Sequence, residues 1–300
     1  MPSPHLLIID AQSLGARAAH VAPATADAAR LWCQMVRGAV LDAGATHVIA
    51  AWDHHGPTFR HTLFPQYKHR RTGETRTRVT PIREAVEATG IASCSVDGFE
   101  GDDVVASVMA TLRGEARITL LSNDSDLLQF VSDGVDVATY VGVGKGPQGA
   151  RIKPWSIADV EARYGVRPID IPAFKALCGE TGDDIPGVAG IGKGMAVKIL
   201  RRWGSIEKAF EATEFVSHRD DTARLAGKRD VVALMLQLTT IRQDAPLPDL
   251  ALARCEVGRV NWLSGSAASA RVDPATPVAR SAAGPGMDDV PMPDEAPGWL

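Results

Sequence analysis

The sequence has few cysteines and no long apolar run. Its 300 residues include only four cysteines, which lie far apart and form no CxxC pair. This spacing indicates neither a zinc site nor a disulfide framework, and it favours a reducing compartment. No apolar run reaches the length of a transmembrane helix, and residues 1–5 lack the basic region and apolar core of a signal peptide. We therefore expect a cytoplasmic protein that does not bind membranes.

An overall excess of positive charge is also missing, since the formal net charge is −4. Between Arg60 and Arg83, however, seven lysine and arginine residues accompany a single acidic residue, Glu74. Such a segment is most often a solvated face. Here Phe59 and Tyr67 lie beside the charges, and an aromatic ring can stack on a base while cations hold the backbone. The segment is therefore a candidate nucleic-acid contact.

The first half of the chain alternates between apolar runs and helix-like segments. The runs at 6–10, 47–53 and 118–121 are continuous, which is typical of a parallel sheet with both faces covered. From about 156 to 245 the pattern is mostly helical, and beyond about 264 the chain is rich in Ala, Pro, Gly and Asp. We expect an α/β core over 1–155, in which helices flank a mainly parallel central sheet. A helical subdomain over 156–262 and a disordered tail over 263–300 follow.

Carboxylates collect at the carboxyl ends of the apolar runs and at the start of one helix. They are Asp10, Asp53, Glu100, Asp102, Asp103, Asp124 and Asp126. Any one of them could simply cap a helix or favour its N-terminus. Ligands of parallel sheets lie at the carboxyl ends of the strands, so the set as a whole predicts one divalent-cation site. Oxygen-only ligands favour Mg²⁺ or Mn²⁺.

A glycine-rich segment, Gly187–Gly194, satisfies the GxxxxGK spacing of a nucleotide-binding loop. The next residue is Gly194 and not Ser or Thr, and residues 183–186 form a turn pattern and not a buried strand, so we reject that interpretation. A helix–hairpin–helix explains the segment better, because its backbone N–H groups can hold phosphates without reading bases. Lys193 and Lys198 would add charge. A simple tight turn between packed helices stays an open alternative.

Taken together, these segments resemble the 5′-nuclease superfamily, which includes flap endonucleases and the 5′–3′ exonuclease domain of bacterial DNA polymerase I. The similarity covers about residues 6–250, and no polymerase module follows, so we expect a stand-alone form. The matching segments are 7–10, 52–53, 59–60, 67–71, 100–103, 124–129 and 183–192. The resemblance implies a PIN-like core with a helical arch over about 65–90, and a helix–hairpin–helix of the H3TH type in the helical subdomain.

The resemblance also implies two metal positions. Asp10, Asp53, Glu100, Asp102 and Asp103 match the first; Asp124, Asp126, Glu180 and Asp183 match the second, with Asp102 near both. Lys68, Arg71 and Asp103 match catalytic residues. DNA contacts are implied for Arg60, Tyr67, Lys68, Arg70, Arg71, Gly187, Gly190, Gly192, Lys193 and Lys198, and a K⁺ ion for the carbonyls at Val188 and Ile191. Glu180 departs from the family, which usually has Asp there.

The implied activity is a structure-selective, metal-dependent 5′–3′ exonuclease and flap endonuclease. We expect a monomer that acts on 5′ flaps, 5′ overhangs and nicked or branched DNA, with RNA–DNA hybrid 5′ ends as further candidates. One alternative is a DNA-junction-binding protein with weak or lost catalysis, which the Glu180 substitution motivates. The other is a PIN-like ribonuclease, which is less favoured because such domains are shorter and lack the hairpin.

Overall fold

The computed structural model describes residues 3–22, 24–71, 74–142, 145, 151–213 and 221–262. Within these ranges, one six-stranded sheet has the order β3-β2-β1-β4-β5-β6. The strands are β1 (His5–Asp10), β2 (His47–Ala51), β3 (Ala92–Cys94), β4 (Arg117–Leu121), β5 (Val135–Tyr140) and β6 (Ile152–Trp155). The first five strands run parallel and β6 is antiparallel to β5. The expected mainly parallel sheet is confirmed.

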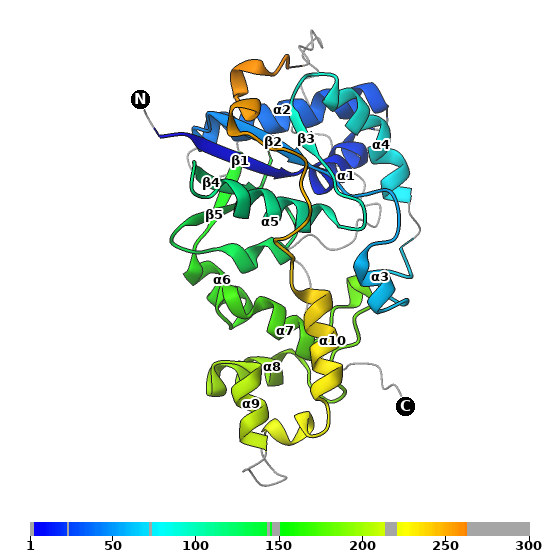
Figure 1. Cartoon of the computed structure of the whole chain (residues 1–300), viewed down its shortest axis with the longest axis vertical. Helices are drawn as coiled ribbons and strands as arrows, with labels where there is room; N and C mark the ends of the chain where they lie inside the picture. Colours follow the sequence, from blue (N-terminus) through cyan, green and yellow to red (C-terminus); the bar gives the residue numbers. More distant parts are fainter. Residues whose placement is uncertain are drawn as a thin grey trace, which may run out of the picture.

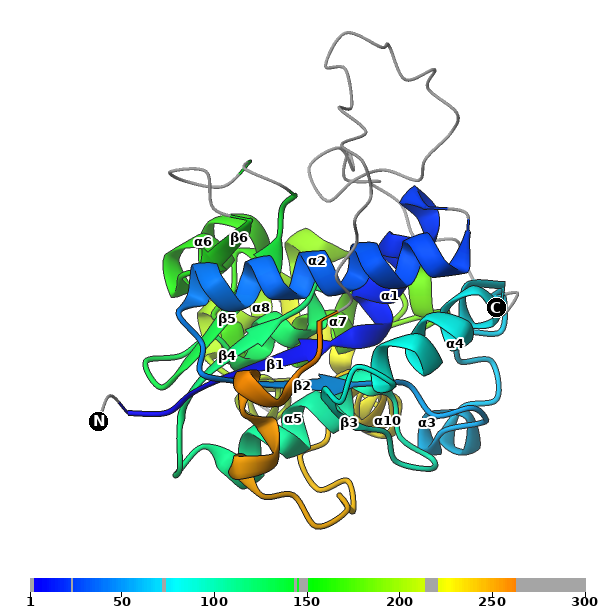
Figure 2. The same ribbon diagram turned by 90° about the horizontal axis from the view of Figure 1, so that it is seen from above.

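Helices cover both faces of the sheet, as the continuous apolar strands require. Figure 2 shows α1 (Ala11–Val21) and α2 (Thr25–Ala43) on one side and α5 (Gly101–Leu112) on the other. The central strand β1 is buried throughout, and its residues alternate between two cores: Leu7 and Ile9 face α1 and α2, whereas Leu6 and Ile8 face α5. β1 therefore lies at the centre of the fold, and its last residue, Asp10, lies at the edge of the sheet formed by the carboxyl ends of the parallel strands.

The segment predicted as an arch is helical in its second part. Residues 65–70 form turns, and α4 (Glu74–Glu87) follows. α4 packs against α1 and α2 through the buried side chains of Val79, Ile82 and Val86. A short helix, α3 (Phe59–Leu63), precedes the turns. The basic segment thus runs from α3 through turns to a helix that is anchored on the core.

The second half is helical, as expected. It comprises α6 (Ile157–Tyr164), α7 (Ile171–Cys178), α8 (Lys193–Trp203), α9 (Ile206–Thr213) and α10 (Arg229–Thr239). Figure 1 shows α7 to α10 stacked below the sheet and its helices. Short 3-10 helices connect the elements: η1 (Asp126–Phe130), η3 (Pro168–Asp170), η4 (Thr181–Asp183), η5 (Asp221–Leu225), η6 (Leu252–Cys255) and η7 (Val257–Arg259).

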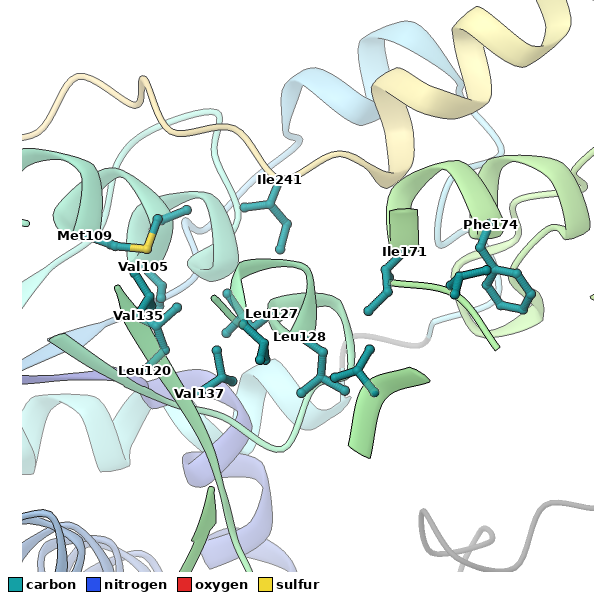
Figure 3. Packing of buried hydrophobic residues seen from close by; sticks show 14 of the residues in the cluster. Val105, Met109, Leu120, Leu127, Leu128, Val135, Val137, Ile171, Phe174 and Ile241 are labelled. Atoms are coloured by element: carbon teal, nitrogen blue, oxygen red, sulfur yellow. The ribbon is translucent and has the colours of Figure 1, made fainter. Parts of the chain in front are cut away.

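One apolar core joins the sheet to the helical part. Figure 3 shows Val105 of α5, Leu120 of β4 and Leu127 of η1 packed in the same cluster as Ile171 and Phe174 of α7. Because the two parts share this buried contact, the edge of the sheet and the helices beside it are held in a fixed relation.

The chain returns to the sheet after α10. The N–H of Val257 donates to the carbonyl of Thr46, and Glu256 bridges to His47 at the start of β2. The last described segment therefore lies beside the sheet and not beside the helical subdomain. The expected disordered tail, 263–300, lies outside the described residues. In the part of the chain that is described, no helix combines the length and apolar character needed to cross a membrane.

Candidate active site

Carboxylates converge at the carboxyl edge of the sheet. Asp10 ends β1, where one oxygen accepts from the N–H of Ser13 at 3.0 Å and the other from the hydroxyl of Ser122 at 2.5 Å. Asp53 follows β2 and accepts from the N–H of Gly101 at 2.7 Å, which ties it to the start of α5. Strand ends and a helix start thus bring these side chains to one place.

Burial and mutual repulsion act on this group, which we call the acidic centre: Asp10, Asp53, Asp102, Asp124 and Asp126. Burial raises the pKa of Asp10 to about 7, and the charges of Asp124 and Asp53 add to the effect. Burial also raises the pKa of Asp102 well above its usual range, with repulsion from Asp124, Asp10 and Asp126. Carboxylates this close ionise together only when cations share them.

A second group extends the acidic centre toward the helical part. Asp126, Glu180 and Asp183 each place an oxygen so that the three atoms lie within 4.8 Å of one another. Burial, followed by repulsion from Asp126, raises the pKa of Glu180 to about 7. We call these three residues the second carboxylate cluster. The longer side chain of Glu180 therefore still reaches the position that the sequence predicted for it.

These donors fit a divalent metal. They are oxygen atoms only, and they lie at the carboxyl edge of a parallel sheet. The observation that carries the assignment is geometric: oxygens of Asp126, Glu180 and Asp183 lie within 4.8 Å of one another. Burial, followed by repulsion between neighbouring carboxylates, also raises the pKa of Asp102 and Asp126, and a bound divalent cation would remove that repulsion.

Basic residues border the carboxylates. The ammonium of Lys68 lies 2.9 Å from both carboxylate oxygens of Glu100 and 3.6 Å from an oxygen of Asp183. Arg71, whose side chain is largely exposed, pairs with Asp183. Although burial raises the pKa of Glu100, Lys68 and Arg60 lower it below its usual value. Lys68 and Arg71 therefore stand where a phosphate beside the acidic centre would meet positive charge.

The structure places Asp103 away from the acidic centre. Its side chain is 0% exposed, and the guanidinium of Arg60 donates to both its oxygens at 2.6 and 2.9 Å. The backbone N–H groups of Glu100 and Arg242 also donate to it, at 3.1 and 2.9 Å. Four donors thus hold the two oxygens of Asp103, which makes it a structural anchor, and its expected role as a metal ligand stays a prediction.

Arg60 and Tyr67 are buried as well, which changes the roles expected for them. Arg60 is 3% exposed and also donates to the carbonyl of Leu238 at 2.9 Å, so it has no face for a phosphate. Tyr67 is 2% exposed and packs against Met235 and Leu238, so its ring does not stack on a base in this conformation. Its hydroxyl donates to Glu100 at 2.9 Å and to Asp183 at 3.3 Å. Tyr67 thus orients carboxylates.

Arg70 contacts the loop that carries Glu180 and Asp183 of the second carboxylate cluster. It pairs with Asp184, and its guanidinium also donates to the carbonyl of Thr181 at 3.0 Å. Its side chain is 68% exposed, so a face remains open to solvent. Arg70 therefore joins the basic segment to this loop and can still meet a ligand.

The glycine-rich segment forms a hairpin between α7 and α8. Gly187 has φ of 70°, and a Cβ there would lie 2.3 Å from the nitrogen of Gly179, so only glycine fits. Gly190 has φ of 81°, and Gly192 is the N-cap of α8, whose first residue is Lys193. Val188 and Ile191 point their side chains into the core, and Lys193 and Lys198 are exposed. The helix–hairpin–helix is confirmed. The nucleotide-binding loop is excluded because, in the described range 151–213, α7 and η4 directly precede the hairpin and not a strand.

The sequence did not reveal Lys175, which lies inside the second carboxylate cluster. Its ammonium is 2.7 and 2.9 Å from the two carboxylate oxygens of Glu180 and also contacts Asp126. It is 6% exposed and sits on α7 among apolar residues. A single lysine in an otherwise apolar helix, five residues before Glu180, is the sequence signal that could have identified it.

The chain matches two adjacent family models. One is described as 5′-3′ exonuclease, N-terminal resolvase-like domain, and matches residues 5–165. The other is described as 5′-3′ exonuclease, C-terminal SAM fold, and matches residues 166–261. The first match ends at residue 165 and the second begins at residue 166, whereas the boundary expected from the sequence, between 155 and 156, stays a prediction.

Curated relatives include bacterial DNA polymerases I. The thermostable enzyme of Thermus thermophilus is 34% identical over 221 residues, which cover 72% of this chain and 25% of that protein. The Bacillus subtilis enzyme is 29% identical over 254 residues, which cover 81% of this chain and 28% of that protein. The chain thus spans about a quarter of the length of these relatives.

Solved structures share the fold. A T5 5′-exonuclease mutant superposes with a TM-score of 0.64 at 20% identity, covering 79% of this chain and 87% of that one. A bacteriophage T5 D15 flap endonuclease in a complex with DNA and metal ions gives 0.65 at 20% identity, covering 78% and 88%. The catalytic core of Rad2 with a DNA substrate gives 0.53 at 12% identity, covering 81% and 82%.

Proposed function

Because the chain belongs to the 5′-3′ exonuclease family, we propose that it hydrolyses DNA phosphodiester bonds near 5′ ends and flap junctions, with a divalent metal. The observation that carries the proposal is the acidic centre at the carboxyl edge of the sheet, bordered by Lys68 and Arg71. Phosphate hydrolysis needs both elements, because metal-binding carboxylates alone would repel the DNA backbone.

Mg²⁺ or Mn²⁺ is the proposed metal. Asp10, Asp53 and Asp102 would hold it at the first position, with Glu100 at its border. Asp124, Asp126, Glu180 and Asp183 would form the second position, with Asp102 near both. A divalent ion there would lower the pKa of bound water and neutralise charge on the phosphate. Lys68 and Arg71 would stabilise negative charge on the scissile phosphate, and Tyr67 would keep Glu100 and Asp183 oriented toward them.

The hairpin is the proposed contact for the duplex part of the substrate. Its backbone and the N-terminus of α8 favour phosphates, and exposed Lys193 and Lys198 add charge. A K⁺ ion at the carbonyls of Val188 and Ile191 is part of the proposal. We also propose that the substrates are 5′ flaps, 5′ overhangs, nicked or branched duplex and RNA–DNA hybrid 5′ ends. A monomeric state and a location of the protein in the cytoplasm stay predictions.

The test is cleavage of a 5′-labelled flap duplex by purified protein with Mg²⁺, with Mn²⁺ and with EDTA. We expect cutting at the flap junction in either metal and none in EDTA. Binding without cutting in both metals would contradict the proposal and favour a junction-binding protein. A matched RNA flap cut faster than the DNA flap would instead favour a PIN-like ribonuclease.

The hairpin makes a separate prediction about binding. Replacing Lys193 and Lys198 together with alanine should weaken duplex binding in Ca²⁺, and the salt dependence should fall by about 0.9 in log–log slope for each phosphate that is no longer neutralised. Lys208→Ala is the matched control, since Lys208 is an exposed lysine on α9. An unchanged slope in the double variant would show that these lysines do not contact phosphates.

A further inference from the structure

Lys175 is a buried cation among carboxylates that are expected to bind metal. It is 6% exposed, and its neighbours along α7, Phe174, Ala176 and Leu177, are buried and apolar. Its ammonium lies 2.7 and 2.9 Å from the carboxylate oxygens of Glu180, and it also contacts Asp126. A buried lysine of this kind requires paired negative charge, and these two carboxylates provide it.

The same two carboxylates belong to the second carboxylate cluster. Asp126, Glu180 and Asp183 bring oxygens within 4.8 Å of one another, which is the spacing a single cation can bridge. Lys175 takes the oxygens of two of these three residues, whereas Asp183 is held by Lys68 and Arg71. A divalent ion at this cluster would therefore compete with the Lys175 ammonium for the same oxygens, and the two positive charges would repel each other.

The first metal position, near Asp10 and Asp102, differs in this respect. One oxygen of Asp10 accepts from the N–H of Ser13 and the other from the hydroxyl of Ser122, which are both neutral donors. The lysine beside this position, Lys68, pairs with Glu100. The two metal positions are thus unequal: Asp10 at the first has neutral donors, whereas Lys175 supplies a cation to two carboxylates of the second.

We propose that Lys175 is a built-in cation of the second carboxylate cluster. Its ammonium pairs with Asp126 and Glu180 in the place of a divalent ion, and a second divalent ion binds there only by displacing it. The inference rests on the proposed function, because that function supplies the first metal. The protein should therefore bind its first divalent ion much more tightly than its second.

The experiment measures Mn²⁺ binding to metal-free protein by electron paramagnetic resonance, for the wild type, Lys175→Met and Lys208→Met. We expect Lys175→Met to bind its second Mn²⁺ about tenfold or more tightly than the wild type does, because the competing charge is gone. Lys208→Met removes an exposed lysine of α9 and should behave as the wild type. If Lys175→Met does not fold, Lys175→Gln keeps a polar side chain and should shift the second affinity in the same direction.

A second readout is the melting temperature with and without Mn²⁺. In EDTA, Lys175→Met should have a lower melting temperature than the wild type, because Asp126 and Glu180 lose their cation. Adding Mn²⁺ should raise the melting temperature of Lys175→Met by more than it raises that of the wild type. Equal or weaker binding of the second Mn²⁺ in both Lys175 variants would overturn the inference while leaving the first metal intact. If the wild type bound no Mn²⁺ at all, the proposed function would fail as well.

Discussion

Replacing Asp102 with asparagine is expected to stabilise the metal-free protein at pH 8 and to abolish DNA cleavage. Burial, together with repulsion from Asp124, Asp10 and Asp126, raises the pKa of Asp102 in the folded state. The folded protein therefore holds this proton more tightly than the unfolded chain, and stability falls as the pH rises from the unfolded pKa through the folded one. Each unit by which the pKa is raised corresponds to about 1.4 kcal/mol. The neutral amide removes that penalty.

The measurement is thermal unfolding in EDTA at pH 5.5 and pH 8. The wild type should lose more stability over this range than Asp102→Asn, and Mg²⁺ should stabilise the wild type more than the variant. Asp133→Asn is the control, since Asp133 is an exposed carboxylate away from the acidic centre. If the variant were less stable than the wild type at both pH values, the favourable contacts of the Asp102 carboxylate would contribute more to the stability of the fold than burial and repulsion remove.

Replacing the next residue, Asp103, with asparagine should have the opposite effect on stability. The change leaves the guanidinium of Arg60, 3% exposed, without its bidentate partner, and it weakens the acceptor for the N–H groups of Glu100 and Arg242. Breaking a buried ion pair by removing one partner costs about 3–5 kcal/mol. Urea unfolding at pH 7.5 measures this loss in the free energy of unfolding.

Metal binding separates the roles of the two aspartates. At a temperature where Asp103→Asn is folded, it should bind its first Mn²⁺ with nearly the wild-type affinity, whereas Asp102→Asn should not. A stable Asp103→Asn that loses Mn²⁺ binding would show that Asp103 is a metal ligand, as the family resemblance implies, and would remove the structural role assigned to it here.

Much of the fold follows from the sequence, because buried parallel strands have continuous apolar runs. The run that became β1 ends in Asp10, and those that became β2 and β4 lie just before Asp53 and Asp124 of the acidic centre. Strands β5 and β6 were not predicted. β5 interrupts its buried positions with partly exposed ones, and β6 is an antiparallel edge strand with two exposed residues. Neither pattern is distinctive in a single sequence.

The site was harder to assign residue by residue. Asp102 and Asp103 are adjacent on a helix, so their side chains point about 100° apart, and the sequence does not say which one faces the metal. The answer depends on Arg60 and on the backbone at Arg242, which is 139 positions after Asp103. Contacts with residues of α10, which are also distant in sequence, bury Arg60 and Tyr67. Local charge and aromatic content alone would place both side chains on the surface.

The contacts of Arg60 and Asp103 also set an order of events during synthesis. Arg60 needs the carbonyl of Leu238, 178 positions later, and Asp103 needs the N–H of Arg242. At about 5–20 residues per second, a ribosome makes the intervening chain only over many seconds. Until then the start of α5, which carries Asp102, lacks the backbone contacts that fix its neighbour. We expect a nascent chain that stops before residue 238 to form its sheet and still lack the two contacts that hold Arg60 and Asp103 at the start of α5.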